Sequence, residues 1–354
     1  MKITDVKVEK LQLKLDVPIK VAFGVVEYVQ NLIVKIETDE GLYGIGEGAP
    51  LEFVTGETLD HVVIATRLLG RGIMGQDPLN LEKIHYIMDS TLSNNTSSKA
   101  AIDIALHDIK GKIMNAPLYK VLGGHTNKFN TDVTIGISTP EQMAKEAKER
   151  TAQGFKLLKI KAGIDPQKDI DAIKLIREAV GDNIRLRMDA NQGWTVSDAV
   201  KVIKAVEKYK VEAVEQPLPH WDFEGMASVR NKADIMIMAD ESVFSPIDAI
   251  RIVRMKCADI INIKLMKSGG LYKAEQINAI SQAANIRCMV GCMLESKIGI
   301  TAAASLVAGK RNITEADMDS FLYIKDDVVD GGLKLENGTI TLPEEPGLGI
   351  SIDF

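Results

Sequence analysis

The sequence predicts an α/β protein whose main part is a closed parallel barrel of eight strand–helix units, a (β/α)8 barrel, preceded by a smaller α+β unit. Two observations lead to this fold class. Short apolar segments rich in β-branched residues recur at intervals of roughly 25 residues, separated by amphipathic helical segments such as "VSDAVKVIKAVEKY". The N-terminal third differs, because strand patterns come first and helical patterns follow. The eight predicted barrel strands are 131–138, 156–162, 184–190, 212–218, 235–241, 260–266, 288–294 and 312–318.

The N-terminal unit begins with alternating apolar and polar residues at 3–15, 31–41 and 42–48. The turn signal "TDEG" between the last two segments indicates an antiparallel meander. From about residue 58 to 120 the apolar spacing becomes helical, most clearly in "TSSKAAIDIALHDIKGKI", where Ser and Thr precede the first apolar positions. Strands followed by helices indicate an α+β capping domain.

We expect residues 1–125 to form the capping domain and residues 126–322 to form the barrel. The last segment, 323–354, is rich in glycine and alternating residues, so we expect short strands that return to the capping domain and complete it. An open doubly wound sheet is the alternative arrangement of the strand–helix repeat. The sequence disfavours it, since "GLYGIGEG" precedes no helix where a dinucleotide fingerprint requires one.

The composition excludes several classes of function. Hydrophobic residues make up 45% and charged residues 26% of the 354 residues, as in an ordinary soluble globular protein. The net charge of −6 argues against a nucleic-acid partner, and no segment approaches the roughly 20 apolar residues of a membrane span. The three cysteines are odd in number and lie in apolar segments, which favours a reducing cytoplasm over a disulfide framework. The sequence disfavours a metal site on Cys288 and Cys292, because no second Cys or His pair follows them.

Charged residues stand at the carboxyl ends of the predicted barrel strands. From Lys161 to Asp189, Glu215, Asp240 and Lys264, the successive separations are 28, 26, 25 and 24 residues. Each residue therefore occupies the same place in its own strand–helix unit, and all would meet at the barrel mouth, where barrel enzymes carry out their chemistry. Three carboxylates from neighbouring strands repel one another without a cation. An all-oxygen set suits a hard divalent ion, Mg²⁺ above all.

Lys161 and Lys264 would approach this carboxylate group from opposite sides. A divalent cation and a second ammonium nearby disfavour the charged form of a lysine, so that it can act as a base. One lysine would remove the α-proton of a metal-bound carboxylate compound, the metal would hold the enediolate, and the other lysine would return a proton from the opposite face. The product is the epimer. A Schiff base on one lysine is the alternative, but it gives the carboxylates no role.

These residues together resemble the enolase superfamily, in its muconate-lactonizing-enzyme-like subgroup, whose Lys or His bases work with Mg²⁺. The matching stretches are "KIKAG", "RMDANQGW", "VEQPL", "MADES" and "INIKLMKSGG", and the resemblance extends over essentially the whole chain. It implies three Mg²⁺ ligands, Asp189, Glu215 and Asp240, and two acid/base catalysts, Lys161 and Lys264. Lys159 would help to neutralise the substrate carboxylate and would favour the uncharged form of Lys161. Asn191 and Glu241 would support the metal site from behind its ligands.

The motif "DMD", with Asp317 and Asp319, resembles the Asp-x-Asp signature of dipeptide epimerases in that subgroup. Taken alone, two aspartates one residue apart share one face of a strand and repel each other, as in a second metal site. In the family the pair binds the free α-ammonium of an L,L-dipeptide, whose C-terminal residue is epimerised with its carboxylate on Mg²⁺. The resemblance implies the same partner here, the substrate ammonium rather than a metal or a protein lysine. It also implies that Thr134, Cys292 and Leu294 lie against the dipeptide backbone.

One departure from the family limits the substrate assignment. Members that act on Ala-Glu have an arginine in the first loop of the cap, and in "KVAFGVVEY" the matching position is Gly24 among apolar neighbours. An acidic side chain there would lack a compensating charge. We therefore expect a hydrophobic or aromatic C-terminal residue, with Phe23 and Gly24 near it. A core role for Phe23 within the cap is the alternative.

Two other interpretations stay open. A different reaction of the same subgroup, such as cycloisomerisation, o-succinylbenzoate synthesis or N-acylamino acid racemisation, uses substrates without a free ammonium and leaves Asp317 and Asp319 without a partner. A catalytically inactive barrel kept as a binding protein is disfavoured by the intact set of lysines and carboxylates. The expected partners are a small dipeptide substrate, Mg²⁺ as cofactor, and further copies of the chain in a homo-oligomer.

Overall fold

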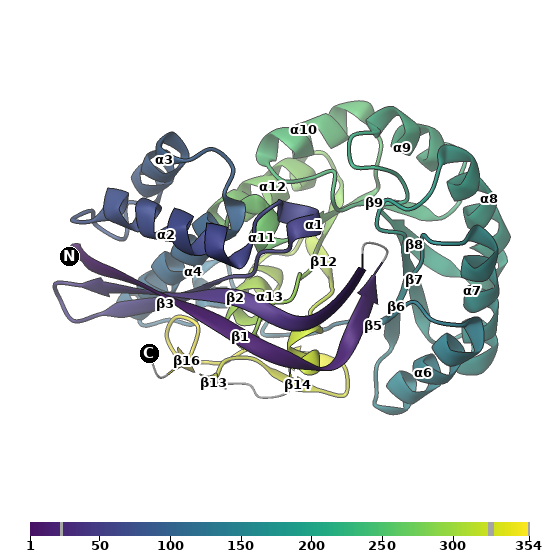
Figure 1. Cartoon of the computed structure of the whole chain (residues 1–354), viewed down its shortest axis with the longest axis horizontal. Coiled ribbons are helices and arrows are strands. Elements are labelled where there is room, and N and C mark those ends of the chain that lie inside the picture. The colour runs from purple at the N-terminus through teal and green to yellow at the C-terminus, as the bar shows by residue number, and fades with distance from the viewer. Residues whose placement is uncertain (22–23, 325–328, 353–354) are drawn as a thin grey trace.

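Two layers of structure make up the molecule, an N-terminal sheet with helices on it and a ring of strands surrounded by helices (Figure 1). The computed structural model describes residues 1–21, 24–324 and 329–352, with the backbone path alone for residues 17–21 and 24–26. Within these ranges, no helix is long and apolar enough to cross a membrane.

The N-terminal sheet is the predicted antiparallel meander, with strands β1 (Ile3–Val21), β2 (Gly24–Thr38) and β3 (Tyr43–Gly48) in sequence order. Its first two strands are longer than expected. The pairing of Val21 with Gly24 continues the hairpin through the segment that we expected to be a loop. Gly24 is thus the first residue of β2, while Phe23 lies outside the described residues.

Helices follow the meander, as the apolar spacing predicts. They are α1 (Glu52–Thr55), α2 (Leu59–Ile73), α3 (Leu81–Thr91), α4 (Thr96–Ile113) and α5 (Leu118–Val121). Helix α4 lies directly on β3, because alternate glycines remove the side chains between them. A Cβ on Gly44 would lie 2.0 Å from the carbonyl oxygen of Ala105, and one on Gly46 would lie 2.0 Å from that of Ala101. The segment "GLYGIGEG" is therefore a helix-packing strand and not a nucleotide-binding loop.

Eight parallel strands form the barrel in chain order, and each lies within or beside a predicted segment. They are β5 (Val133–Ile135), β6 (Leu157–Lys161), β7 (Arg185–Asp189), β8 (Val211–Glu215), β9 (Met236–Ala239), β10 (Ile260–Ile263), β11 (Arg287–Val290) and β12 (Ile313–Ala316). The ring closes where the backbone N–H of Asp132, just before β5, donates to the carbonyl of Ala316 at 3.3 Å. We refer to this junction of β5 and β12 as the seam. The predicted barrel fold is confirmed.

Helices cover the outside of the barrel after each of the first seven strands. They are α6 (Pro140–Ala152), α7 (Pro166–Val180), α8 (Val196–Val206) with the 3-10 helix η1 (Glu207–Tyr209), α9 (Phe223–Arg230), α10 (Pro246–Met255), α11 (Leu265–Ser268) with α12 (Leu271–Ala283), and α13 (Lys297–Gly309). After β12 the described chain forms a 3-10 helix, η2 (Ser320–Tyr323), in place of an eighth α-helix. Residues such as Leu158 and Ile160 face these helices and are buried, so their neighbours Lys159 and Lys161 face the barrel axis.

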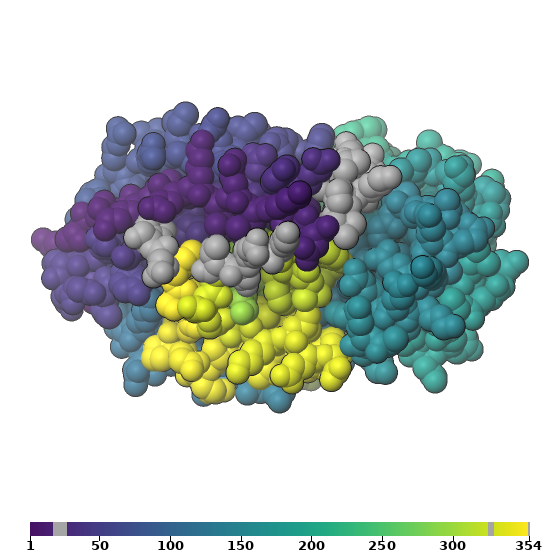
Figure 2. All heavy atoms as spheres, turned by 60° about the horizontal axis from the view of Figure 1, so that its bottom comes forward, coloured from purple at the N-terminus to yellow at the C-terminus, as the bar shows by residue number. Residues whose placement is uncertain are grey.

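The C-terminal segment forms short strands beside the N-terminal layer, as Figure 2 shows in yellow next to purple. Strand β14 (Lys334–Glu336) pairs with β15 (Thr339–Thr341), which pairs with β4 (Lys128–Asn130), and β13 (Asp330–Gly331) pairs with β16 (Ile350–Ser351). The N–H of Leu118 in α5 donates to the carbonyl of Gly347 at 2.8 Å. The domain limits at residues 125 and 322 stay a prediction.

Candidate active site

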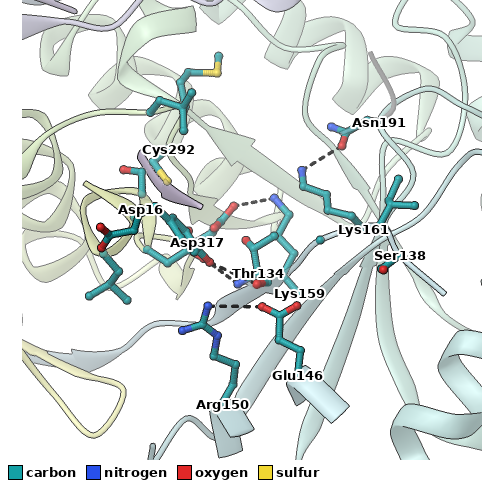
Figure 3. A pocket seen from close by; sticks show the side chains of 18 of the residues that line it. Asp16, Thr134, Ser138, Glu146, Arg150, Lys159, Lys161, Asn191, Cys292 and Asp317 are labelled. Atoms are coloured by element: carbon teal, nitrogen blue, oxygen red, sulfur yellow. Dashed lines mark hydrogen bonds and ion pairs between the residues drawn. The ribbon is translucent and has the colours of Figure 1, made fainter. Parts of the chain in front are cut away.

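A cavity of about 750 Å³ lies at the mouth of the barrel, between the carboxyl ends of its strands and the N-terminal layer (Figure 3). Barrel residues line its floor, helix α6 lines one side, and Leu51 and Val54 of the cap line another. Most residues predicted for the site line this cavity: Thr134, Lys159, Lys161, Asn191, Glu241, Lys264, Cys292, Leu294, Asp317 and Asp319.

The strand register brings the predicted charges to one level of the barrel. Lys161 on β6 is paired with Asp189 on β7, and Asp189 is paired with Glu215 on β8. Asp240 and Lys264 directly follow β9 and β10. Because β6 and β10 stand four places apart in a ring of eight strands, Lys161 and Lys264 approach from opposite sides. The regular spacing in the sequence thus corresponds to one ring of side chains.

Ion pairs join the lysines to the three buried carboxylates. Lys161 Nζ lies 2.7 Å from Asp189 Oδ2, and Lys264 Nζ lies 2.8 Å from Asp240 Oδ2. Lys159 Nζ lies 3.0 Å from Asp189 Oδ2 and 3.2 Å from Glu215 Oε2. Each carboxylate is at most 3% exposed, so these pairs act with little screening by water.

The pKa values indicate that the carboxylate group accommodates further positive charge. Burial favours the neutral form of Asp189 and Asp240, but the nearby lysines outweigh it and hold both pKa values low. For Glu215, burial and the charge of Asp189 raise the pKa to about 7. Three buried carboxylates from adjacent strands form an all-oxygen donor set, and a divalent cation would favour the ionised form of all three. The residues present therefore fit Mg²⁺, and Asp189, Glu215 and Asp240 are the residues that would hold it.

The charge state of Lys264 differs from the expectation of a lowered pKa. Burial lowers the pKa of Lys264, but the charge of Asp240 outweighs burial, and the net pKa is raised above its ordinary value. Protein charges alone thus favour the ammonium form. A lowered value requires a cation that neutralises Asp240.

Asn191 and Glu241 line the cavity beside Lys161, and their support of a metal site stays a prediction. Asn191 Oδ1 accepts from Lys161 Nζ at 2.9 Å, a contact visible in Figure 3, and Asn191 Nδ2 donates to Glu241 Oε1 at 3.1 Å. Burial raises the pKa of Glu241 to about 8. Glu241 Oε2 is buried without a hydrogen-bond partner among the described residues. The pair links the lysine side of the ring to β9.

Two residues of the ring were missed in the sequence. Asn262 Nδ2 donates to Glu215 Oε1 at 2.7 Å, and Lys267 Nζ lies 2.6 Å from Asp240 Oδ1. Asn262 stands two residues before Lys264, so strand alternation could have placed it on the same face. The fully buried Lys267 gave no such signal, because it reaches Asp240 only through the short helix α11.

Asp317 and Asp319 lie side by side at the seam, where Lys159 connects Asp317 to the carboxylate ring. Asp319 Oδ2 accepts from the backbone N–H of Thr134 at 2.7 Å and from the hydroxyl of Tyr323 at 2.9 Å. Asp317 Oδ2 accepts from Lys159 Nζ at 2.6 Å (Figure 3). The expectation that neither aspartate pairs with a protein lysine is therefore wrong for Asp317, because β6 lies close enough to the seam for Lys159 to reach it. Tyr323 was not foreseen, although it follows Asp319 by one helical turn.

The cysteines are all free and buried, in accord with the absence of a disulfide framework. The Sγ of Cys292 and one oxygen each of Asp317 and Asp319 lie within 4.8 Å of one another. The loop after β11 therefore adjoins the two aspartates. Leu294 of the same loop faces the cavity together with Leu51 and Val54 of the cap, and Asp16 of β1 also lines the cap side.

The fold and the site define a class: a barrel enzyme with opposed lysines around a buried carboxylate ring that fits a divalent cation. Comparison with known families agrees. Residues 142–354 match the family described as "Enolase C-terminal domain-like", and residues 3–123 match the N-terminal domain of the mandelate racemase and muconate lactonizing enzyme group. The chain belongs to the enolase superfamily, and it is an isomerase.

Individual relatives are similar over their full length. The chain is 47% identical to the hydrophobic dipeptide epimerase of Enterococcus faecalis, over 99% of this chain and all of that protein. It is 44% identical to the L-Ala-D/L-Glu epimerase of Clostridium acetobutylicum, over 99% of both chains. The crystal structure of the E. faecalis dipeptide epimerase with Mg and L-Leu-L-Tyr matches with a TM-score of 0.98 at 47% identity, over 99% of this chain and 100% of that one.

Proposed function

We propose that the chain is a Mg²⁺-dependent dipeptide epimerase that inverts the α-carbon of the C-terminal residue of L,L-dipeptides. One observation carries the proposal: a single cavity is lined by Lys161 and Lys264, which contact the carboxylate ring from opposite sides, and by the buried Asp317–Asp319 pair. The carboxylate ring with its cation would bind a substrate carboxylate, the lysines would exchange protons with the α-carbon next to it, and the aspartates would bind an ammonium. A dipeptide with free ends presents these three groups in that order.

The lysines carry out the proton transfers in this proposal. When bound, Mg²⁺ supplies positive charge to the substrate carboxylate and makes the neighbouring α-proton more acidic. One lysine, uncharged, accepts the α-proton from one face. The opposite lysine, as an ammonium, donates a proton to the same carbon from the other face. The two lysines thereby exchange protonation states, and atoms and charges balance.

Lys159 and the aspartates hold the two ends of the substrate. Lys159 stands between the ring and Asp317, so its charge serves the carboxylate end while Asp317 and Asp319 serve the ammonium end. Asp319 is fixed by Thr134 and Tyr323, which leaves its second oxygen for the ligand. Thr134, Cys292 and Leu294 line the path between the two ends and would contact the dipeptide backbone.

A hydrophobic or aromatic C-terminal residue is the preference we propose. It is supported by the apolar wall of Leu51, Val54 and Leu294, and by the name of the E. faecalis relative. Phe23, which was expected to lie near this side chain, is outside the described residues, and Gly24 is the first residue of β2.

The test is a panel of L,L-dipeptides incubated with the Mg²⁺-loaded protein in D2O, with α-proton exchange followed by NMR. We expect exchange at the C-terminal residue, faster for Ala-Phe and Ala-Tyr than for Ala-Glu. A clear preference for Ala-Glu would contradict the side-chain assignment.

Asp319→Asn separates a dipeptide epimerase from the other reactions of the superfamily. We expect the variant to lose at least about tenfold in kcat/KM on free dipeptides, since the ammonium then meets a neutral amide. An N-acetylated dipeptide has no ammonium and should respond little to the change. Equal activity of variant and wild type on free dipeptides would contradict the role of Asp319 at the ammonium. Activity confined to substrates without an ammonium would favour a cycloisomerase, an o-succinylbenzoate synthase or an N-acylamino acid racemase.

A further inference from the structure

Glu47, on cap strand β3, is a fully buried carboxylate that none of the reaction steps uses. Its Oε1 accepts from Asn31 Nδ2 at 2.6 Å and from the backbone N–H of Ser296 at 2.9 Å. Its Oε2 accepts from the hydroxyl of Ser296 at 2.9 Å and from the backbone N–H of Gly299 at 2.7 Å. A cap side chain thus binds the N-terminus of barrel helix α13, where free backbone N–H groups favour an anion.

Close approach at this point depends on Gly299. A Cβ there would lie 2.9 Å from Glu47 Oε2 and 2.7 Å from the side chain of Glu295. Burial raises the pKa of Glu47, which its four donors partly offset. No lysine, arginine or histidine of the described residues pairs with Glu47, and burial of an unpaired carboxylate is costly, so the four hydrogen bonds are what hold it there.

The segment that Glu47 holds is the loop of residues 291–296, which joins β11 to α13. Cys292, Met293 and Leu294 of this loop line the cavity. Asn31, the partner of Glu47, also donates to the carbonyl of Leu294 at 2.9 Å. The cap therefore fixes both the end of the loop, at Ser296, and the last residue of its cavity-facing part, Leu294.

From the other side, the loop is attached to the residues that face the substrate ammonium. The hydroxyl of Ser320 donates to the carbonyl of Glu295 at 2.8 Å, and Ser320 directly follows Asp319. The Glu295 carboxyl accepts from the N–H of Met293 at 2.6 Å, which sets the turn of the loop itself. One chain of hydrogen bonds thus runs from the cap through the loop to Ser320, the residue after Asp319.

We propose that Glu47, with Asn31, is a positioning residue for substrate binding, which sets where Cys292 and Leu294 meet the dipeptide backbone. The inference rests on the proposed function for its substrate, and on the hydrogen bonds alone for its effect on the loop. Glu47 touches neither the substrate nor the reacting atoms. Because the loop contacts the dipeptide equally before and during proton transfer, its displacement weakens binding rather than the chemical step.

Glu47→Gln is the sharpest variant, because it keeps the size of the side chain and removes one acceptor. In either orientation the new NH2 group faces a backbone N–H, that of Ser296 or that of Gly299. We expect KM for the best dipeptide to rise about tenfold while kcat changes by less than about threefold. Mg²⁺ affinity should stay unchanged.

Asp108→Asn is the matched control. Asp108 is likewise a buried cap carboxylate, and it accepts backbone N–H groups from two distant segments, Ile45 at 3.0 Å and Leu348 at 2.8 Å. None of these residues lines the cavity. We expect this variant to lose stability with KM unchanged. An equal rise of KM in both variants would overturn the proposal and leave a purely structural role for Glu47.

Hydrogen exchange of the substrate-free proteins gives a readout that does not depend on activity. Relative to the wild type, Glu47→Gln should lose amide protection over residues 291–299, whereas Asp108→Asn should not. Should Glu47→Gln fail to fold, Asn31→Ala decides, since it removes the donors to Glu47 and to Leu294 with the helix contacts kept. Unchanged protection and unchanged KM in the folded variant overturn the proposal. A wild type without any dipeptide exchange would refute the proposed function, and the loop protection would still test the effect of Glu47.

Discussion

At the scale of single residues, the mouth of the barrel is a compensated charge cluster. Lys159, Lys161, Lys264 and Lys267 each contact at least one carboxylate of the ring or the seam. Removal of one lysine leaves the other pairs in place: Asp189 keeps Lys159, and Asp240 keeps Lys267. Lysine variants of this site should therefore fold, and kinetic changes in them report on chemistry.

Lys161→Ala and Lys264→Ala should each lower the rate of epimerisation at least about a hundredfold, while proton exchange continues at one face of the substrate α-carbon. The reason is that each lysine serves one side of the α-carbon. Exchange of the α-proton in D2O, measured separately from the L,L and L,D epimers, should persist for one epimer in each variant, and for opposite epimers in the two variants. Lys145→Ala, a change of an exposed lysine on the α6 side of the cavity, is the control and should exchange both epimers. Loss of exchange from both epimers in either lysine variant would argue against two bases.

The ring residues were predictable from the sequence because each stands at a fixed place in a repeating unit. Lys161, Asp189 and Glu215 are paired in register as their spacing requires. The contact of Lys159 with Asp317 was not predictable, because 158 residues separate them and only closure of the ring brings them together. The roles of the lysines as catalysts stay predictions that the variants above test, and the roles of the carboxylates as ligands stay predictions as well.

At the scale of elements, the loops after β6 and β7 are tied together by one carboxylate. Asp169, on the first turn of α7, accepts from the N–H of Gly163 at 3.1 Å and from Trp194 Nε1 at 3.0 Å, both on Oδ2. These loops follow Lys161 and Asp189 directly. Asp169 thus holds two neighbouring parts of the site at a fixed separation.

Asp169→Asn should stabilise the protein above pH 6 and change little below pH 4. Burial raises the pKa of Asp169 to about 6, above the unfolded value of about 3.9, so the folded state binds the proton more tightly. The stability that protonated Asp169 provides to the folded state is fully present below about pH 4, and it is lost as the pH rises through about 6. Asparagine can accept both hydrogen bonds without the charge, and we expect a gain of up to about 2 kcal/mol at pH 8.

Urea unfolding at pH 4.5 and pH 8 measures this difference. Asp171→Asn removes an exposed carboxylate from the same helix and serves as the control. Equal effects of Asp169→Asn at both pH values would contradict the assignment.

Elements with a clear period were predicted well, and the differences have local causes. The hairpin of β1 and β2 was underestimated because "DVPIK" and "FG" carry turn residues, yet pairing resumes from Ile19 with Val26 to Val21 with Gly24. The Gly-rich β3 was assigned as a strand without a reason for its glycines. That reason, the approach of α4, depends on tertiary packing that no local pattern encodes.

At the scale of the whole molecule, the carboxylate ring links metal binding to stability. A cation that binds only the folded chain stabilises it by about 2.7 kcal/mol at a hundredfold excess over its Kd. We expect Mg²⁺ to raise the Tm of EDTA-treated protein in a concentration-dependent way, with KCl at equal ionic strength as the control.

Glu215→Gln should remove most of this Mg²⁺-dependent shift in Tm. The variant is a mild one, because the pKa of Glu215 is already raised to about 7 by its surroundings. Differential scanning fluorimetry of both proteins across a Mg²⁺ titration makes the comparison. A shift of equal size in wild type and variant would place the ion elsewhere.

The seam has a consequence for the order in which the site is assembled during folding. Thr134 and Asp319, which meet there, are 185 residues apart, so the entropy of closing that loop must be overcome before the contact forms. The other strand pairs of the barrel, from β5 with β6 to β11 with β12, join strands that follow each other in the sequence, so they form without closing that long loop. We therefore expect the Asp317–Asp319 site to be the last part of the mouth to form. A chain whose barrel is still open at the seam would then have the lysines and carboxylates but, on the proposed function, no selectivity for a free amine. A ligand that contacts both Asp319 and the opposite side of the cavity would therefore stabilise the closed barrel. It should slow the opening of the seam more than Mg²⁺ alone does.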